Sequence, residues 1–509
     1  MKFNFKRKAA PTVANYEGAQ SFVLTPELEL YTAVVTASLS DNFYENAADR
    51  LKRLRELLAK NDVAFVAKLA VYAREQMYLR SVPLVLTVEL AKQHNGDDLI
   101  QSLTNRIVQR ADEITELLSY YALANGRAGS KQLNKLSKQL QKGLAAAFNR
   151  FDEYQFAKYN RGAAIKLKDA LFLVHPTAKD EAQQVLFDKI VKDALQAPYT
   201  WEVEISAWGQ EKYDSVELKQ LALKDKWEEL VMSNKLGYMA ALRNLRNMLD
   251  AGISNEVLDK VCSDLSNAQA VAKSKQLPFR FLSAYRELKD VKSMQVSKVL
   301  DALEKAVMQS CASIKGYDSN TSVVIAADVS GSMQTAVSAN SKIQRFDIGL
   351  LLAMLLQSRC EAVMTGMFGD TWKVINLPKK NILSNVDALY RREGEVGYST
   401  NGYLVIKDLL QRRQKADKVM LFTDCQLWNS SGSGDTIENL WNSYKQIVPA
   451  AKLYLFDLAG YGNTPVSVLQ NDVFLIAGWS DKVFDVLAAI EDGGNALKMI
   501  NQITVKRDE

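Results

Sequence analysis

Residues 323–332 read VVIAADVSGS, an apolar run that passes directly into a loop of oxygen-bearing side chains. The run at 323–327 is continuous and rich in β-branched residues, which predicts a strand buried on both faces of a parallel sheet. Loops at the carboxyl ends of such strands carry the ligand sites of open α/β sheets. This stretch therefore predicts both the fold of the C-terminal half and the position of a site within it.

The segments downstream of this strand repeat the alternation of strand and helix. Apolar runs predict four more strands, at 363–368, 419–423, 453–456 and 473–476. Helical spacing predicts intervening helices at 346–356, 403–411 and 436–447. Strands that alternate with helices indicate a doubly wound parallel sheet, and so a Rossmann-like α/β domain.

Upstream of residue 316 the pattern is helical. Apolar residues recur three and four positions apart, as at Leu51, Leu54 and Leu58, with charged residues on the opposite face. Short breaks at 94–98 and 125–126 separate such segments, which predicts successive helical hairpins stacked as HEAT-like repeats. We expect two domains, an all-α domain at 1–315 and an α/β domain at 316–509.

Composition limits the classes of function. With 64 Lys and Arg against 59 Asp and Glu, the formal net charge is +5, so any nucleic-acid-binding surface must be local. No stretch is long and apolar enough to span a bilayer, and no apolar segment follows the basic N-terminus as a secretory signal requires. The widely separated cysteines favour the reducing cytoplasm and argue against disulfides or a zinc site. They are Cys262, Cys311, Cys360 and Cys425.

The loop after the strand at 323–327 supplies candidate metal ligands. Asp328, Ser330 and Ser332 are hard oxygen donors of the kind that Mg²⁺ takes, and we expect Thr400 and Asp424, in later loops of the same domain, to complete the set. A helix-capping loop is the simpler interpretation of an isolated Asp-x-Ser-x-Ser, since Asp and Ser are favoured at helix starts. The buried strand, the later Thr loop and the second strand-end Asp together favour a site for Mg²⁺ or another divalent cation.

These five residues resemble the metal-ion-dependent adhesion site of von Willebrand A domains, and the resemblance covers 316–509. It implies an ion with an open position that a ligand carboxylate can fill. Asp424 is followed by Cys425, where many A-type domains have glycine. The two histidines, His94 and His175, lie outside this domain, and no Ser/His/Asp or Cys/His arrangement can be assembled in it, so we expect no enzyme.

A second candidate surface lies at 127–169, where ten cations accompany three acidic residues. Helical spacing puts four of the cations on one helix face: Lys131, Lys135, Lys138 and Lys142. Aromatic side chains that can stack on unpaired bases interleave with the cations, at Phe148, Phe151, Tyr154, Phe156 and Tyr159. Lysine-rich faces are usually just solvated and such rings are usually core, so a plain helical scaffold stays open as the alternative.

Several segments resemble TROVE-domain proteins, in the same order along the chain: 65–74, 79–83, 148–159, 168–176, 239–245 and 277–282. A TROVE region followed by an A-type domain is the architecture of the Ro autoantigen family and its bacterial relatives. The resemblance implies a ring of helical repeats closed by the A-type domain. Such a ring is expected to hold small structured non-coding (Y-like) RNA on its basic outer surface and single-stranded ends of misfolded RNAs in its central hole.

Matching the TROVE motif places Lys158 and His175 at RNA-contacting positions of the family. The second cation of the motif is displaced, because Arg161 lies one place early and Gly162 is in register. A histidine before proline is otherwise typical of a turn, which is the alternative for His175. We extend the expected RNA surface to the neighbouring lysines, Lys131, Lys135, Lys138, Lys142, Lys166 and Lys168.

The resemblance further implies a monomeric cytoplasmic protein that acts in RNA quality control or as a scaffold for an exoribonuclease such as polynucleotide phosphorylase. Two other functions stay open. The A-type domain is also suited to metal-dependent docking of a carboxylate-bearing protein, or to partnership with a separate ATPase as in chelatases. The chain itself contains no Gly-x-x-x-x-Gly-Lys-[Ser/Thr] nucleotide loop, which argues against an ATPase activity of its own.

Overall fold

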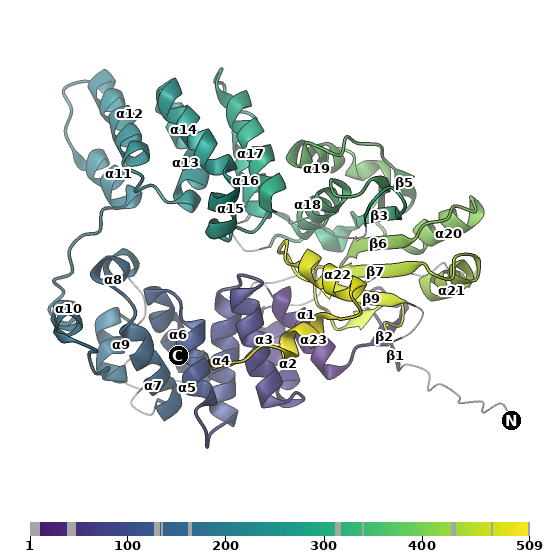
Figure 1. Cartoon of the computed structure of the whole chain (residues 1–509), viewed down its shortest axis with the longest axis horizontal. Coiled ribbons are helices and arrows are strands. Elements are labelled where there is room, and N and C mark those ends of the chain that lie inside the picture. Colours follow the sequence, from purple (N-terminus) through teal and green to yellow (C-terminus); the bar gives the residue numbers. More distant parts are fainter. Residues whose placement is uncertain are drawn as a thin grey trace. The chain divides into compact units, whose positions relative to one another are not determined.

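The computed structural model describes residues 11–37, 47–126, 133, 136–160, 165–310, 317–337, 341–428, 434–469 and 472–506. The chain divides into two compact units (Figure 1). The α/β unit comprises Met1–Leu57, Ser266–Asp290 and Leu300–Met499. The helical unit comprises Leu58–Leu265, Val291–Val299 and Ile500–Glu509.

A six-stranded sheet forms the centre of the α/β unit, in the order β5-β4-β3-β6-β7-β9. The strands are β3 (Ser322–Asp328), β4 (Ala362–Phe368), β5 (Trp372–Val374), β6 (Lys418–Thr423), β7 (Lys452–Asp457) and β9 (Val473–Ala477). All neighbouring pairs are parallel except β4 with β5. The predicted doubly wound fold is confirmed, and each of the five predicted strands is present. The antiparallel edge strand β5 was not predicted.

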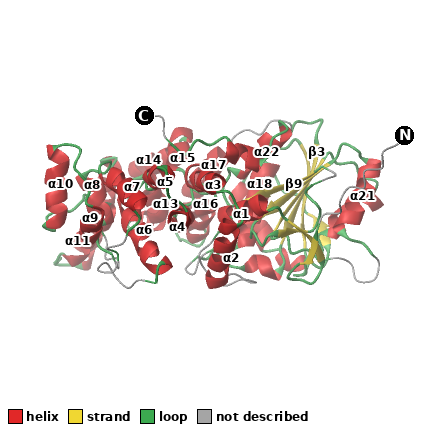
Figure 2. Cartoon of the chain, turned by 90° about the horizontal axis from the view of Figure 1, so that it is seen from below, coloured by secondary structure: helices red, strands yellow, loops and turns green. Residues whose placement is uncertain are grey.

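Helices cover both faces of this sheet (Figure 2). On one face, α20 (Tyr403–Gln411) and α21 (Ile437–Ile447) bury apolar side chains against Val324 and Leu421. On the other face lies α18 (Arg345–Gln357), whose Gly349 is close to Phe422. Every residue of α18 is buried, as expected of a helix that is apolar on all sides. Further helices of this unit are α15 (Ala268–Ser274), α16 (Phe279–Leu288), α19 (Ile382–Tyr390) and α22 (Val483–Glu491).

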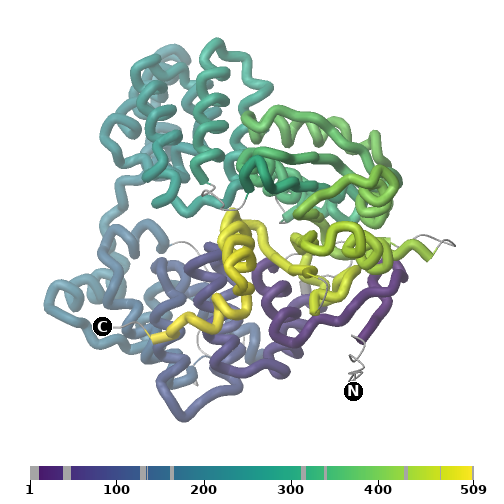
Figure 3. Tube along the Cα trace, turned by 45° about the vertical axis from the view of Figure 1, so that its right-hand side comes forward, coloured from purple at the N-terminus to yellow at the C-terminus, as the bar shows by residue number. Residues whose placement is uncertain are grey.

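The N-terminal segment is part of the α/β unit. The hairpin of β1 (Thr12–Ala14) and β2 (Gln20–Val23) pairs with β8 (Asn463–Thr464), in the loop after β7 (Figure 3). The following helix α1 (Pro26–Val35) packs on β9, and Tyr31 Oη bonds to the Ala477 backbone at 3.3 Å. The α/β unit thus contains residues far upstream of 316, while a division into folding domains at 1–315 and 316–509 stays a prediction.

The described residues of the helical unit form helices that pack on near neighbours in sequence, for example α3 on α4, α5 on α7 and α6 on α9. This is the pattern of stacked helical hairpins. The predicted breaks are confirmed, because α4 ends at Gln93 and α6 at Ala124. The bounds are α3 (Val63–Glu75), α4 (Ser81–Gln93), α5 (Leu99–Ile107), α6 (Ala111–Ala124), α7 (Lys138–Phe148), α8 (Glu153–Tyr159), α9 (Leu167–Val174), α10 (Glu181–Val191), α11 (Trp201–Gln210), α12 (Val216–Met232), α13 (Tyr238–Asp250) and α14 (Asn255–Ser266).

Among the described residues, α14 crosses a limit between the units by its last residue, Ser266, and three further helices cross one: α2 (Ala47–Ala59), α17 (Val296–Ser310) and α23 (Ala496–Asn501). In the described ranges, no helix is both long and apolar enough to cross a membrane. Cys262, Cys360 and Cys425 are buried thiols that form no disulfide, and Cys311 lies outside the described residues.

Candidate functional site

The predicted metal-binding residues come together at the carboxyl edge of the sheet, where β3 lies beside β6. Asp328 is the last residue of β3, and Asp424 directly follows β6. The strand that follows β3 in the chain, β4, lies on one side of β3 in the sheet, and the later strand β6 lies on the other side. The strand order therefore reverses at β3, which makes this edge the topological switch point of the sheet. Connections diverge at a switch point and leave room for a ligand between them.

Hydrogen bonds from the surrounding loops orient both carboxylates. The Ser330 N–H donates to Asp328 Oδ1 at 2.9 Å, and Thr423 Oγ1 donates to Asp328 Oδ2 at 2.7 Å. The Gln426 N–H donates to Asp424 Oδ1 at 3.0 Å. Fixed carboxylates of this kind are what a preorganised ion site requires.

Two of the predicted ligands have buried oxygens without a hydrogen-bond partner among the described residues. They are Thr400 Oγ1 and Asp424 Oδ2, in residues that are 4% and 0% exposed. An unsatisfied buried polar atom costs about 1–3 kcal/mol, and more when it is charged. Oxygens of this kind are the donors that Mg²⁺ prefers, so the chemistry of the side chains present fits the predicted ion.

Burial raises the pKa values of the acids at this edge. The pKa of Asp328 rises to about 7, because burial disfavours its charge and Asp424 repels it. Burial also raises the pKa of Asp424, with the Ser332 hydroxyl opposing the rise. A bound cation would remove the mutual repulsion of the two carboxylates.

Two further charged groups, neither of them predicted from the sequence, lie beside this pair. Asp457, at the end of β7, accepts N–H bonds from Ala459 at 2.9 Å and Gly460 at 2.8 Å, and burial raises its pKa to about 6. Arg345, the first residue of α18, donates to Tyr461 Oη at 2.9 Å, and its charge favours ionised Asp424 and Asp457. Asp457 could have been predicted from the sequence, because it ends an apolar run that predicts a strand. The position of Arg345 beside these acids depends on tertiary packing and could not have been predicted.

Cys425 keeps a backbone conformation that favours glycine. Its φ is +62°, in the left-handed region, and its N–H donates to Thr423 Oγ1 at 3.1 Å. The side chain is buried, and burial raises the pKa of the thiol well above its ordinary value. Glycine adopts this conformation without strain, whereas a residue with a side chain adopts it rarely, so the loop after Asp424 turns at a position suited to glycine.

A cavity of about 420 Å³ opens at this site. Its walls are Glu17, Gly331, Ser332, Asp370, Tyr398, Ser399, Thr400 and Trp428. In the parts of the chain that the structure describes, no three His, Cys, Asp or Glu side chains form a metal-binding group. An ion here would therefore depend on the hydroxyls of Ser330, Ser332 and Thr400 as well as on the two carboxylates.

The predicted RNA-binding cations that the structure describes lie on three helices of the helical unit. Lys138 and Lys142 are exposed on α7, Lys158 is half-buried on α8, and Lys166 and Lys168 are exposed at the start of α9. Because α7 begins at Lys138, the structure describes only two members of the expected four-lysine face. Lys131, Lys135 and Arg161 lie outside the described residues.

Three of the five rings predicted to stack on bases are core residues instead. Phe148, Phe151 and Phe156 are at most 5% exposed, and Phe156 lies 5.8 Å from each of the other two, centroid to centroid. Aromatic spacing on an amphipathic helix cannot separate a core ring from a ligand-binding one. Tyr154, which is 44% exposed, and the partly exposed Tyr159 remain at the surface.

Lys158 lies against both surface rings. Its Nζ is 5.4 Å from the Tyr154 ring centroid and 5.7 Å from that of Tyr159. The Arg110 guanidinium, at the start of α6, lies 4.3 Å from the Tyr159 centroid. Two cations and two rings from different helices thus meet at one surface, a combination that can contact phosphate and stack on a base together.

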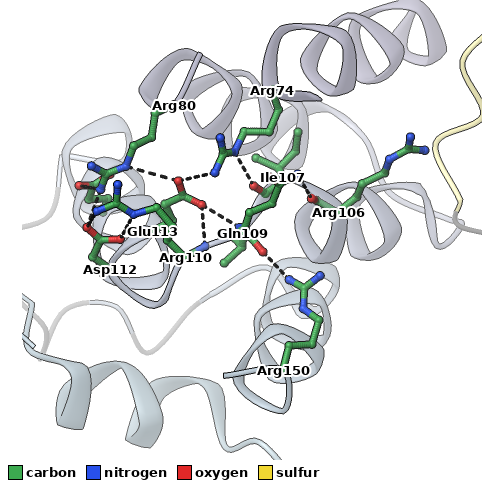
Figure 4. Close-up of polar contacts among 11 residues, drawn as sticks. Arg74, Arg80, Arg106, Ile107, Gln109, Arg110, Asp112, Glu113 and Arg150 are labelled. Carbon is green, nitrogen blue, oxygen red and sulfur yellow. Dashed lines mark hydrogen bonds and ion pairs between the residues drawn. The ribbon is translucent and has the colours of Figure 1, made fainter. Parts of the chain in front are cut away.

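Arg110 belongs to an ion-pair network that sequence reasoning missed (Figure 4). Glu113 has a fully buried side chain, and Arg74 donates to it at 2.7 Å. Arg110 donates to Asp112 at 2.8 and 3.1 Å, and Arg80 donates to the same carboxylate at 2.7 Å. Residues of α3 and α6 are paired here although they lie more than thirty positions apart in the sequence. The spacing of residues along the chain therefore does not predict the network.

His175 follows the last residue of α9 and has φ +50°. Its N–H donates to the Leu171 carbonyl at 2.9 Å, and the residue is exposed. It is therefore a helix-terminating residue, as the turn interpretation predicts, and its exposed position also suits contact with a ligand. His94 directly follows α4, and its ring bonds to Asp97 Oδ1 at 2.8 Å, in line with a structural role.

Comparison with known proteins identifies relatives. Telomerase protein component 1 of Rattus norvegicus and of Mus musculus are each 24% identical to this chain over 355 residues, a match that covers 53% of the chain and 13% of those proteins. The solved Deinococcus radiodurans RO (RSR) protein aligns with 91% of this chain and 99% of its own, with a TM-score of 0.57 and 18% identity. That likeness shows a common fold. Residues 28–226 and 195–345 match the TROVE domain, and the chain belongs to the TROVE domain family.

Proposed function

We propose that this protein binds RNA through the surface formed by Lys158, Tyr154, Tyr159 and Arg110, called the α8 surface below. Its ligands would be small structured Y-like RNA and single-stranded ends of misfolded RNAs. Membership of the TROVE family supports this assignment, and the contact of Lys158 with two surface rings is the observation that carries it.

The chemistry of the α8 surface suits unpaired nucleotides. A lysine or arginine can neutralise phosphate, while tyrosine rings offer stacking surfaces to bases of any sequence. The role we propose is that of a non-catalytic cytoplasmic protein of RNA quality control, which presents RNA to an exoribonuclease such as polynucleotide phosphorylase.

The test replaces the cation and one ring separately in the full-length chain. We expect Tyr154→Ala to weaken binding of a structured RNA with a single-stranded end by about fivefold or more, since base stacking contributes roughly 1–3 kcal/mol. Lys158→Ala should weaken binding and reduce the slope of log Kd against log salt by about one, because one phosphate contact is lost.

Lys219 provides a matched control, since its Nζ lies 5.2 Å from the Trp208 ring centroid at another place in the helical unit. Lys219→Ala should leave both affinity and salt slope unchanged. Equal RNA affinity of the wild type and the Lys158→Ala and Tyr154→Ala variants, measured by filter binding, would remove the α8 surface from the assignment.

The unpartnered oxygens at the sheet edge favour a second function. We propose that Asp328, Ser330, Ser332, Thr400 and Asp424 hold Mg²⁺ or another divalent cation, and that this site docks a carboxylate-bearing partner. The ion would supply an exposed positive charge to that carboxylate. The buried Thr400 and Asp424 oxygens support the proposal, since they have no partner among the described residues.

Calorimetric titration with Mn²⁺ tests the ion site. We expect one bound Mn²⁺ in the wild-type chain and none in Asp328→Ala, with equal RNA affinity for both proteins. Asp481→Asn is the control, because Asp481 is a partly buried acid just before α22, outside the proposed ligand set. Absence of Mn²⁺ binding by the wild type would rule out the site.

A further inference from the structure

The cavity beside the proposed ion site has walls of mixed chemistry. Besides hydroxyl groups, the walls carry two acidic side chains, Glu17 and Asp370, and two large rings, Tyr398 and Trp428. No lysine or arginine is among the described residues that line the cavity. Acidic side chains concentrate cations in a concave site, and aromatic rings attract cations to their faces, so these walls favour a positively charged ligand.

Asp370 lies in the turn between β4 and β5, and its side chain is exposed. The Ser399 N–H donates to Asp370 Oδ1 at 2.8 Å. The Ser399 hydroxyl, together with this N–H, holds the pKa of Asp370 below its ordinary value, so the carboxylate is charged at neutral pH. A carboxylate can accept about four hydrogen bonds. Because Asp370 forms no ion pair with any described residue, its carboxylate retains capacity for a cationic donor.

The two rings stay exposed although the backbone at both positions is held. Tyr398 is 49% exposed and Trp428 is 45% exposed. The Trp428 N–H donates to the Thr400 carbonyl at 2.9 Å, and the Gly331 N–H donates to the Tyr398 carbonyl at 3.1 Å. In the ranges that the structure describes, neither ring stacks on another ring or on a cation. One exposed ring is ordinary on a protein surface, but two in the walls of one cavity indicate an interaction site.

Arginine is the side chain that these walls fit best. Its guanidinium is planar, so its edge can pair with a carboxylate while its face stacks on a ring. The cavity volume of about 420 Å³ lies at the small end of the range for ligand sites, which is roughly 300–1,000 Å³. A nucleic acid is disfavoured as the ligand, because the acidic side chains in the walls repel its phosphates.

We propose that this cavity receives an arginine side chain of the docking partner, with the guanidinium paired to Asp370 and stacked on Trp428. The inference rests on the proposed docking function, whose partner it describes: a protein that presents an arginine beside the cation site. Ser332 and Thr400 belong both to the cavity walls and to the proposed ion ligands, so the arginine and the ion would lie within one interface.

The test uses the full-length chain and the peptide acetyl-Gly-Arg-Gly-amide, in which the guanidinium is the only charge. EDTA is present, so binding is measured without a divalent cation. We expect NMR titration to detect binding of this peptide to the wild type. The same peptide with citrulline in place of arginine is similar in shape but uncharged, and it should bind about fivefold more weakly or worse.

Two variants test the two contacts separately. Asp370→Asn removes the charge but keeps an oxygen for the Ser399 N–H, and Trp428→Ala removes the ring. Each should weaken binding of the arginine peptide by about two- to fivefold, because an exposed ion pair and an exposed cation–π contact are each of modest strength.

Asp318→Asn is the matched control for the acid. Asp318 is an exposed acid of the same unit, its Oδ1 accepts one backbone N–H, from Asn320 at 3.0 Å, and it does not line the cavity. Its replacement should leave the affinity for the arginine peptide unchanged.

Equal binding of the arginine and citrulline peptides by the wild type would overturn the proposal. Full affinity for the arginine peptide in Asp370→Asn or in Trp428→Ala would also overturn it. The Mn²⁺ titration is a separate measurement. A wild-type chain that binds Mn²⁺ but not the arginine peptide would refute the arginine contact alone, and one that binds the peptide but no Mn²⁺ would refute the ion site alone, so the two failures are distinguishable.

Discussion

Glu113 is the central acid of the network beneath the α8 surface. Its side chain is fully buried and pairs with Arg74, whose side chain is 11% exposed. A buried pair of opposite charges adds little folding stability compared with an apolar pair in the same place. Removal of one charge is costly, however, because the other is left uncompensated in a medium of low dielectric constant. The network therefore makes the packing of α3 on α6 dependent on one carboxylate.

We predict that Glu113→Gln lowers the free energy of unfolding of the helical unit by about 3–5 kcal/mol, because the Arg74 charge stays buried. Urea denaturation followed by circular dichroism measures the change. The control is Glu116→Gln, which removes an ion pair between Arg80 and a side chain that is 43% exposed and should cost about 0–1 kcal/mol. Equal losses in the two variants would contradict the assignment of the buried pair.

At the scale of the element, α8 is a seven-residue helix that depends on its surroundings. Helices of this length are not stable alone. A capping box closes its N-terminus: Asp152 Oδ1 accepts the Gln155 N–H at 2.7 Å, and Gln155 Oε1 accepts the Asp152 N–H at 3.0 Å. The buried ring of Phe156 stacks on the ring of Phe148 and so packs α8 against the core. The cap and this one ring thus position Lys158 and its two tyrosines.

We predict that Asp152→Ala destabilises α8 by about 1 kcal/mol, since the cap bond is lost. Hydrogen exchange in 153–159 should become faster, and RNA affinity should fall several-fold because Lys158 is held less firmly. Asp180→Ala removes an equivalent cap from α10, where Asp180 accepts the Gln183 N–H at 2.8 Å, and should leave RNA affinity unchanged. Unaltered RNA binding in a variant with a frayed α8 would show that RNA binds elsewhere.

At the scale of the whole chain, the buried acids make the folded state less stable as the pH rises. Burial raises the pKa of Asp328 to about 7 and the pKa values of Asp457 and Asp481 to about 6. In the unfolded chain these carboxyls have ordinary pKa values near 4. The folded chain therefore binds more protons between pH 4 and about 6 to 7, and these acids reduce stability as pH rises through that range.

We predict that the unfolding midpoint of the α/β unit in EDTA is higher at pH 5.5 than at pH 7.5. Each proton concerned changes the free energy of unfolding by about 1.4 kcal/mol per pH unit. Calorimetric scans measure the midpoint, and Asp328→Asn should reduce its dependence on pH. Added Mg²⁺ should raise the midpoint at pH 7.5, since it binds only the folded site. A midpoint in EDTA that rises from pH 5.5 to pH 7.5 would contradict the prediction.

The sequence by itself determined the five parallel strands of the sheet and the metal candidates. The apolar run at 323–327 and its repeats indicated the strands β3, β4, β6, β7 and β9. Asp328 and Asp424 could be placed at one sheet edge because adjacent parallel strands end on the same side. These features depend on residues close together in the chain, or on a topology that alternation implies, so periodicity was sufficient.

Only the tertiary structure decided which side chains meet across distant segments. The hairpin at 12–23 joins β8, and Glu17 lines a cavity with Ser332 and Thr400, more than 300 positions away. Spacing likewise could not tell the buried Phe148 and Phe156 from the exposed Tyr154, because all lie on short amphipathic helices with the same period. The physical reason is that burial and long-range pairing depend on which surfaces pack together, and a local sequence pattern does not contain that information.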